Sequence, residues 1–114
     1  MEDCIFCKIA SGDIPANIIF QDDDFAIFED INPKAPVHFL GIPKKHISSV
    51  KELEAEDTKL IGDLMHRMRK VAEDYPELSK GFRIVSNSGK ESGQTVFHIH
   101  FHLLGGRRMA WPPG

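Results

Sequence analysis

VFHIHFHLLG, residues 96–105, alternates histidine with apolar side chains along most of its length. Alternation with a period of two is typical of a β-strand whose two faces meet different surroundings. In a strand, His98, His100 and His102 share one face, with neighbouring rings about 7 Å apart. The opposite face carries the side chains that we expect to be buried: Phe97, Ile99, Phe101 and Leu103. Imidazole suits nucleophilic, acid–base and ligand roles near neutral pH, so we interpret the histidine face as a site for a phosphoryl group, a metal ion or both.

The length and composition are those of one soluble globular domain over residues 1–114. The chain is 41% hydrophobic and 27% charged, which allows a core without disulfides. A net charge of −3 and the lack of a Lys/Arg stripe argue against nucleic acid as a partner. No apolar run reaches the ~20 residues of a membrane span, and the acidic residues 1–3 are unlike a signal peptide. We expect a cytoplasmic protein with reduced cysteines and no membrane partner.

Apolar patterning and turn residues predict an α+β fold. A short helix is expected over 4–11, ended by Gly12, and a long amphipathic helix over 55–75, ended by Pro76. The expected strands cover 18–20, 25–28, 37–42, 81–87 and 96–104. This order of elements predicts an antiparallel five-stranded sheet with one long helix on one face and a short N-terminal helix.

The loop before the histidines, residues 87–95, reads NSGKESGQT. Two glycines and several small polar residues let backbone N–H groups and hydroxyls face an anion. Most loops of this composition bind nothing, but this one leads directly into three histidines. We interpret it as the second wall of a phosphate pocket, in which a histidine acts as nucleophile and Thr95 helps to stabilise charge on the phosphoryl oxygens.

Cys4 and Cys7 form a Cys-x-x-Cys pair. Such a pair is half of a zinc site and needs two further ligands from elsewhere. A redox dithiol is the alternative, although the usual context of a strand leading into a long helix is absent. The spacing alone leaves both readings open.

Two further polar residues allow a simpler and a functional interpretation. Asp30 follows the apolar run 25–28, where its carboxylate suits a ribose diol beside a base or, equally, a turn before Pro33. His66 lies on the flank of the long helix beside two arginines, and we expect it to be solvated.

The sequence closely resembles the histidine triad (HIT) superfamily. HIHFHLL, residues 98–104, matches the His-φ-His-φ-His-φ-φ motif of that superfamily. The tail GGRRMAWPPG (105–114) and the blocks IPA (14–16), DINPKAPVHF (30–39) and IPKKHI (42–47) are similar to the Hint branch, the histidine triad nucleotide-binding proteins. These blocks occur in order over nearly the whole chain.

The resemblance implies an activity and an assembly. It implies hydrolysis of purine nucleoside 5′-phosphoramidates and acyl-adenylates, with release of the nucleoside 5′-monophosphate through a nucleotidyl-histidine intermediate. It also implies a homodimer in which two five-stranded sheets join into one. The apolar helix face that the dimer would partly use is wide: Leu60, Ile61, Leu64, Met65 and Met68.

The resemblance also implies a role for individual positions. His100 would be the nucleophile and His102 the contact to the α-phosphate, with His98, the buried supporting His38 and Thr95 completing the catalytic set. The implied nucleotide-binding set is Ile5, Phe6, Ile9, Phe28, Asp30, Ile31, Asn87, Gly93, Gln94, Thr95, Val96, His100, His102 and, toward the partner subunit, Trp111. Metal-binding relatives place ligands at Cys4, Cys7, His46 and His98, which predicts a structural zinc and no organic cofactor. Thr95 departs from the serine common in the Hint branch.

Other functions compete with hydrolysis. A nucleotide-binding adaptor with incidental hydrolysis and a nucleotidyl transferase acting on sugar phosphates use the same histidine chemistry. A purely zinc-binding interaction module leaves His100 and His102 unexplained.

Overall fold

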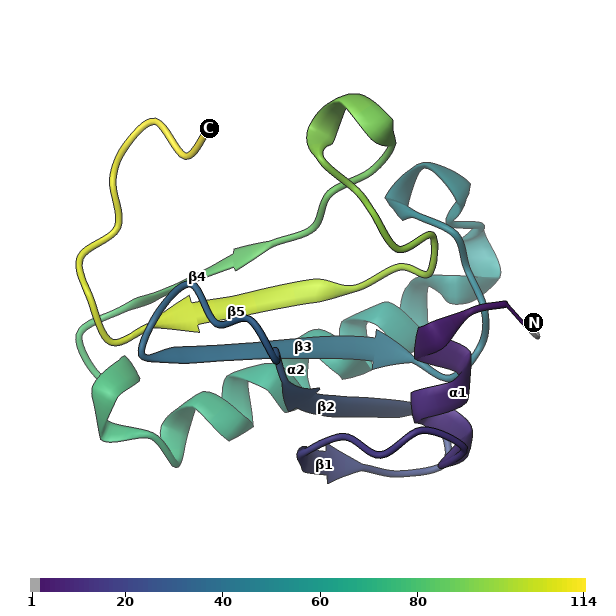
Figure 1. Cartoon of the computed structure of the whole chain (residues 1–114), viewed down its shortest axis with the longest axis horizontal. Coiled ribbons are helices and arrows are strands. Elements are labelled where there is room, and N and C mark those ends of the chain that lie inside the picture. The colour runs from purple at the N-terminus through teal and green to yellow at the C-terminus, as the bar shows by residue number, and fades with distance from the viewer. Residues whose placement is uncertain (1–2) are drawn as a thin grey trace.

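The computed structural model describes residues 3–114 and contains a five-stranded antiparallel sheet (Figure 1). Met1 and Glu2, part of the acidic N-terminal segment considered above, lie outside the described residues. The strands are β1 (Ile18–Gln21), β2 (Phe25–Glu29), β3 (Val37–Pro43), β4 (Phe82–Val85) and β5 (Phe101–Gly105). They lie in the order β1-β2-β3-β5-β4, and each neighbouring pair is antiparallel. The predicted α+β fold is confirmed.

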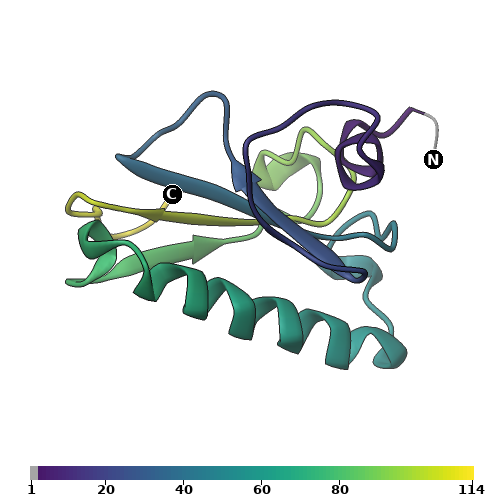
Figure 2. The same cartoon turned by 90° about the horizontal axis from the view of Figure 1, so that it is seen from below.

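Two α-helices lie on opposite faces of the sheet, as Figure 2 shows. The short helix α1 (Ile5–Ser11) covers one face, and the long helix α2 (Thr58–Glu73) covers the other. α2 begins three residues later than predicted, because Ala55–Asp57 forms a 3₁₀ turn closed by reciprocal bonds between Glu54 and Asp57. Within residues 3–114, no helix combines the length and apolar character needed to cross a bilayer.

The interior strands β2 and β3 are buried on both faces, which is why their sequences read as nearly continuous apolar runs. Their alternate residues separate into two clusters. On the α2 side, Phe25, Ile27, Val37 and Phe39 meet α2. The α1 side is formed by Phe6, Ile9, Ala26, Phe28, Leu40 and Ile42. Helix α2 approaches so closely that a Cβ at Gly41 would lie 2.6 Å from Sδ of Met68.

The predicted strand over 96–104 is wrong for its first half, because β5 begins only at Phe101. The regular pairing ends there, because the last pairs are Gly41 with Phe101 and Val85 with His102, so residues 96–100 have no paired partner strand. A backbone bond from the N–H of Ile99 to the carbonyl of Ile47 (2.6 Å) and a bond from the Ser86 hydroxyl to the carbonyl of His100 (2.8 Å) help to hold this segment. Phe97, expected in the core, is 52% exposed. The predicted strand over 81–87 is likewise shorter, at Phe82–Val85.

Candidate active site and Cys/His cluster

The three histidines lie on the α1 side of the sheet, although only His102 belongs to a regular strand. His98 is fully buried and His100 is 7% exposed, while His102 is half-buried. The rings of His100 and His102 are 5.1 Å apart, and the Phe6 ring meets His100 edge-on at 5.0 Å. The expected row of imidazoles is present, and α1 forms one of its walls.

Backbone carbonyls fix the tautomers of the first two histidines. Nε2 of His98 lies 2.7 Å from the carbonyl oxygen of Pro43. Nδ1 of His100 lies 2.8 Å from the carbonyl oxygen of His98. A carbonyl only accepts hydrogen bonds, so both of these nitrogens carry the proton. Neutral His98 therefore has a free lone pair on Nδ1, and neutral His100 has one on Nε2, the atom that a nucleophile needs.

A second chain of contacts fixes His102. Antiparallel pairing places His38 opposite Leu104 and Leu40 opposite His102, so the two histidines are diagonal neighbours on one face. The backbone N–H of Lys34 donates to Nδ1 of His38 (3.0 Å), which leaves the proton of a neutral ring on Nε2. That Nε2 lies 2.9 Å from Nδ1 of His102, and neutral His102 therefore carries its own proton on Nε2.

Burial keeps His38 and His102 neutral. It lowers the pKa of His102 from its ordinary value of 6.5 to about 4, and the charges that His100 and His38 would carry add to this effect. Burial also lowers the pKa of His38, and Asp30 only partly opposes it from 3.4 Å. Near pH 7, His102 can thus offer an N–H to an anion as a neutral imidazole.

Cys4, Cys7, His46 and His98 form a tight cluster, with their ligand atoms within 4.8 Å of one another. Nδ1 of His98 lies 3.3 Å from Sγ of Cys4 and 3.4 Å from Sγ of Cys7. Nδ1 of His46 lies 3.3 Å from Sγ of Cys7 and 3.2 Å from Nδ1 of His98. Burial lowers the pKa of both histidines, which favours the neutral ligand form. Burial and the neighbouring Cys4 raise the pKa of the Cys7 thiol.

Helix α1 positions both cysteines. Cys4 is its N-cap residue, and its Sγ accepts the N–H of Cys7 at 3.3 Å, where a Ser or Asp oxygen would commonly cap a helix. Gly12 ends the helix with a positive φ of 86°. The first turn of α1 therefore presents two sulfurs in the direction of His46 and His98.

The loop 87–95 is shaped by Gln94, which is buried. Its Oε1 accepts the N–H of Gly89, and its Nε2 donates to the carbonyls of Ser48 (2.7 Å) and Val96 (3.0 Å). Both N–H bonds of this amide are used by backbone carbonyls, so the side chain has none left for a phosphate oxygen. Asn87 is half-buried and Thr95 exposed. Gly93 ends the 3₁₀ turn Lys90–Ser92 with a φ of 95°.

Comparison with known proteins identifies the family. The family model "Scavenger mRNA decapping enzyme C-term binding" matches residues 3–110. An uncharacterised HIT-like protein of Synechocystis sp. is 49% identical over 113 residues, covering 99% of this chain and 98% of that protein. The chain belongs to the histidine triad family.

Solved HIT structures share the whole fold. The HIT family hydrolase from Legionella pneumophila has a TM-score of 0.95 at 46% identity and covers 98% of this chain and 100% of its own. A histidine triad protein from Clostridium difficile has a TM-score of 0.92 at 37% identity and covers 96% of each chain. The HIT family hydrolase from Clostridium thermocellum has the same TM-score at 45% identity and the same coverage.

The apolar residues expected around a base divide into two groups in this HIT protein. Phe6, Ile9 and Phe28 are buried in the α1-side cluster, with the rings of Phe6 and Phe28 5.7 Å apart. Val96 is half-buried and packs against the same cluster. Ile5 and Ile31 are exposed. The aromatic residues of this set therefore belong to the core, whereas the exposed pair faces solvent.

Asp30 makes the turn that was one of its two expected roles, and this does not exclude the other, binding of ribose hydroxyls. Its Oδ1 accepts the N–H of Asn32 at 2.8 Å, which makes the turn that the sequence suggested. Its Oδ2 points to His38 instead. One carboxylate thus joins the turn to the histidines.

The groups that sequence reasoning missed are mostly backbone atoms. The carbonyl of Pro43 and the N–H of Lys34 decide where the protons of His98 and His38 lie. No side-chain pattern could have found them. Lys45 gives a weaker case: its ammonium binds buried Asp57 at 2.6 Å and so anchors the segment next to His46.

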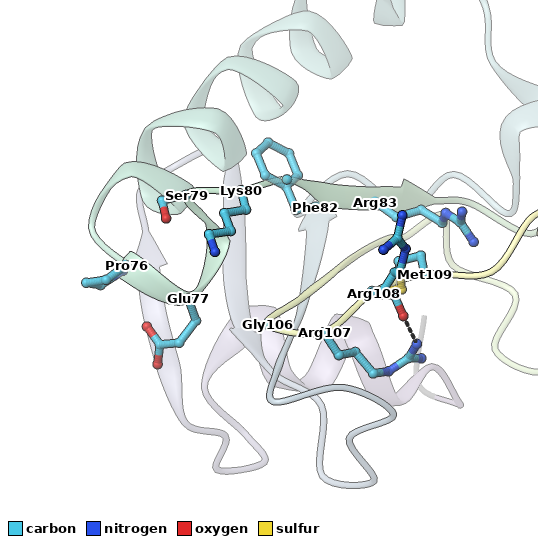
Figure 3. A pocket seen from close by; sticks show the side chains of 11 residues that line it. Pro76, Glu77, Ser79, Lys80, Phe82, Arg83, Gly106, Arg107, Arg108 and Met109 are labelled. Carbon is cyan, nitrogen blue, oxygen red and sulfur yellow. Dashed lines mark hydrogen bonds between the residues drawn. The ribbon is translucent and has the colours of Figure 1, made fainter.

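Trp111 lies on the C-terminal tail at the edge of the sheet and is 82% exposed. Arg83 of β4 donates to the carbonyl of Ala110 and lies 6.0 Å from the Trp111 ring. Between the start of β4 and this tail lies a cavity of about 740 Å³, which Figure 3 shows with Lys80, Phe82 and Arg108 among its lining residues.

Proposed function

We propose that this HIT protein hydrolyses purine nucleoside 5′-phosphoramidates and acyl-adenylates and releases the nucleoside 5′-monophosphate. The observation that carries the proposal is the pairing of tautomers. His100 offers a bare Nε2, whereas neighbouring His102 offers an N–H. A lone pair beside an anion-binding donor is what attack on a phosphoryl group requires. The names of the HIT family hydrolases of similar structure support the reaction class.

Two displacements at phosphorus complete the reaction. In the first, Nε2 of His100 forms a bond to the α-phosphorus, the P–N bond breaks, and the departing nitrogen takes up a proton and leaves as the amine. The ring then carries positive charge, which the His98 carbonyl stabilises through its bond to Nδ1. In the second, water attacks the phosphorus, a proton is released, and His100 leaves with its lone pair restored. His102 stabilises the phosphoryl oxygens throughout.

Substrate binding follows from the same face of the molecule. The α1-side cluster, with Phe6 and Phe28, offers an apolar wall for a purine base. Oδ2 of Asp30 accepts hydrogen bonds from ribose hydroxyls, and Asn87, Gly93 and Thr95 lie on the loop that would face the phosphate. Gln94 supports that loop from within.

We also propose that Cys4, Cys7, His46 and His98 hold a zinc ion. The four groups fit: tetrahedral Zn²⁺ with two thiolates and two imidazoles places S and N ligand atoms about 3.3–3.6 Å apart, and the observed separations are 3.2–3.4 Å. The bond from His98 to the Pro43 carbonyl frees Nδ1 for the metal and acts as an outer support. With four protein ligands the ion would be structural and leave no position for water or substrate.

The edge strand β4 supports the proposed homodimer. Phe82 is 41% and Ile84 37% exposed on this short strand, which has an unpaired edge. A second copy adding its own β4 would continue the sheet and cover both residues. It would also occupy the cavity of Figure 3 and bring the partner's Trp111 toward the nucleotide. Sedimentation at micromolar concentration should show a dimer, and a monomer would remove this role for Trp111.

The experiment that tests the function is incubation of the purified protein with adenosine 5′-phosphoramidate while AMP release is followed. The matched control is His66→Asn, because His66 is an exposed histidine on α2. We expect this variant to release AMP like the wild type. If the wild type binds AMP but releases none from the phosphoramidate, the adaptor alternative replaces the enzyme. Transfer of AMP to a sugar phosphate in preference to water would favour the transferase.

A further inference from the structure

Helix α1 joins the Cys/His cluster to the nucleotide site. Cys4 and Cys7 lie against His98 and His46, and Phe6, between the two cysteines in sequence, packs edge-on against His100. One helical turn therefore carries both thiols and an aromatic wall of the nucleophile's site. His98 makes a second connection, since its ring belongs to the cluster and its carbonyl holds His100.

The position of α1 depends on few contacts. It has seven residues, and helices shorter than about 12–15 residues are marginal on their own. Phe6 and Ile9 supply its buried apolar side chains, and the two thiols supply its polar contacts to His46 and His98. The chemical state of the thiols should therefore affect how firmly Phe6 is held.

The two thiols are placed to react with each other. Cys4 has an extended backbone just before the helix, with φ −93° and ψ 113°, and its Sγ already accepts the N–H of Cys7. Both cysteines are free and half-buried, and their sulfurs lie within 4.8 Å of each other. A Cys-x-x-Cys pair at a helix start is a common setting for reversible disulfide formation.

We propose that Cys4 and Cys7 are an oxidation site, and that their disulfide dissolves the Cys/His cluster and loosens the nucleotide site. The co-reactant is a peroxide. One thiolate attacks its oxygen, an S–O bond forms and the O–O bond breaks. The second thiol then attacks that sulfur, an S–S bond forms and the S–O bond breaks. In sum, two thiols and hydrogen peroxide give a disulfide and two waters.

The disulfide removes sulfur from both histidines. The sulfurs must approach to about 2.05 Å, so they can no longer serve as separate ligands beside Nδ1 of His46 and His98. Helix α1 then keeps only its apolar contacts, and Phe6 is free to move away from His100. Any metal that the cluster holds is released at the same step.

The test compares reduced, oxidised and re-reduced wild-type protein. After hydrogen peroxide treatment, intact mass should fall by two hydrogens per chain, and amide hydrogen exchange should rise in residues 5–11. The Kd for AMP should rise at least about tenfold, which corresponds to 1.4 kcal/mol. A thiol reductant with added zinc should restore all three values. In the double variant Cys4→Ser/Cys7→Ser, peroxide should change neither the exchange of residues 5–11 nor the Kd for AMP, which separates the thiols from the methionines.

Two results would overturn the inference: a disulfide that leaves exchange in α1 unchanged, or oxidation of the thiols without a disulfide. The AMP readout rests on the proposed function, whereas the mass and exchange readouts do not. Failure of the reduced protein to bind AMP would therefore refute the proposed function, while the exchange measurement would still decide the inference.

Discussion

The protein contains two histidine clusters that use the same side chain in opposite ways. In the Cys/His cluster, the Nδ1 atoms of His46 and His98 face each other and two sulfurs, so the group is closed on itself. In the other cluster, His38 supports His102 from behind, and the Nε2 atoms of His100 and His102 are left for a ligand. Residues 98–102 connect the two.

The difference between the clusters comes from their hydrogen-bond partners. The Pro43 carbonyl places the proton of His98 on Nε2, whereas the His98 carbonyl places the proton of His100 on Nδ1. Two histidines separated by one residue therefore expose opposite nitrogens. Nδ1 of His98 suits the binding of a metal ion beside the two sulfurs, and Nε2 of His100 suits attack on phosphorus. Variants at each cluster should therefore have different effects on turnover and stability.

Removal of the nucleophile should lower turnover and leave the Cys/His cluster unaffected. His100→Asn should lower turnover of adenosine 5′-phosphoramidate by at least about 10³-fold, because no covalent intermediate can form. AMP binding and thermal stability should change little, and a steady-state assay with calorimetry measures all three quantities. Near-normal turnover would contradict the proposed mechanism.

Removal of the support behind His102 should have an intermediate effect. His38→Ala leaves Nδ1 of His102 without its donor, and an unpaired buried group costs about 1–3 kcal/mol, or about fivefold to 150-fold in turnover. The loss should fall mainly on kcat. His38→Gln, whose amide can donate to His102, should recover part of it. Equal kinetics for the two variants would assign His38 a packing role only.

Removal of a thiol from the Cys/His cluster should lower the stability of the fold more than the turnover. Cys4→Ser should lose about one zinc per chain and lower the melting temperature by several degrees, with turnover reduced but not abolished. Metal analysis and calorimetry check this, and a chelator should lower the wild-type melting temperature by a similar amount. Full stability of metal-free wild-type protein would leave Cys4 and Cys7 as free thiols.

Low pH should destabilise the fold through the protonation of His102. The folded state holds the pKa of His102 at about 4, below its ordinary value of 6.5. Between these values the unfolded chain binds more protons, so stability falls as pH decreases from 6.5 to 4. His102→Asn should make the unfolding free energy less dependent on pH in this window, as urea titrations would show.

The sequence was sufficient for the fold class and for the membership of both clusters. The order of elements, the amphipathic face of α2 and the burial of Ile99, Phe101 and Leu103 follow from hydrophobic periodicity, which reflects local geometry. The spacing of the three histidines placed them on one face. His38 and the cluster Cys4, Cys7, His46 and His98 came from the family resemblance, and the structure brings these residues together.

The periodicity failed where a strand has no partner. Residues 96–100 alternate like a strand, but the regular pairing of β5 with β3 and β4 stops at Phe101 and His102, and Phe97 is exposed. The pattern predicted the burial of Ile99, Phe101 and Leu103 but not the exposure of Phe97, and it carries no information on which backbone groups are paired. In the same way, Gln94 resembled a phosphate ligand in the loop, although its amide is used by backbone groups of Ser48, Gly89 and Val96.

The sequence by itself determined which residues are candidates for the proposed chemistry, because side-chain type and spacing are local properties and the family resemblance adds the remaining positions. Only the tertiary structure decided what each imidazole can do. The proton positions on His98, His100 and His102 depend on the Pro43 carbonyl, the His98 carbonyl and the Lys34 amide, which acts through His38. Pro43 and Lys34 lie far from His98, His100 and His102 in the chain. They contribute backbone atoms, which every residue possesses in some form. Their effect therefore arises only when the sheet assembles.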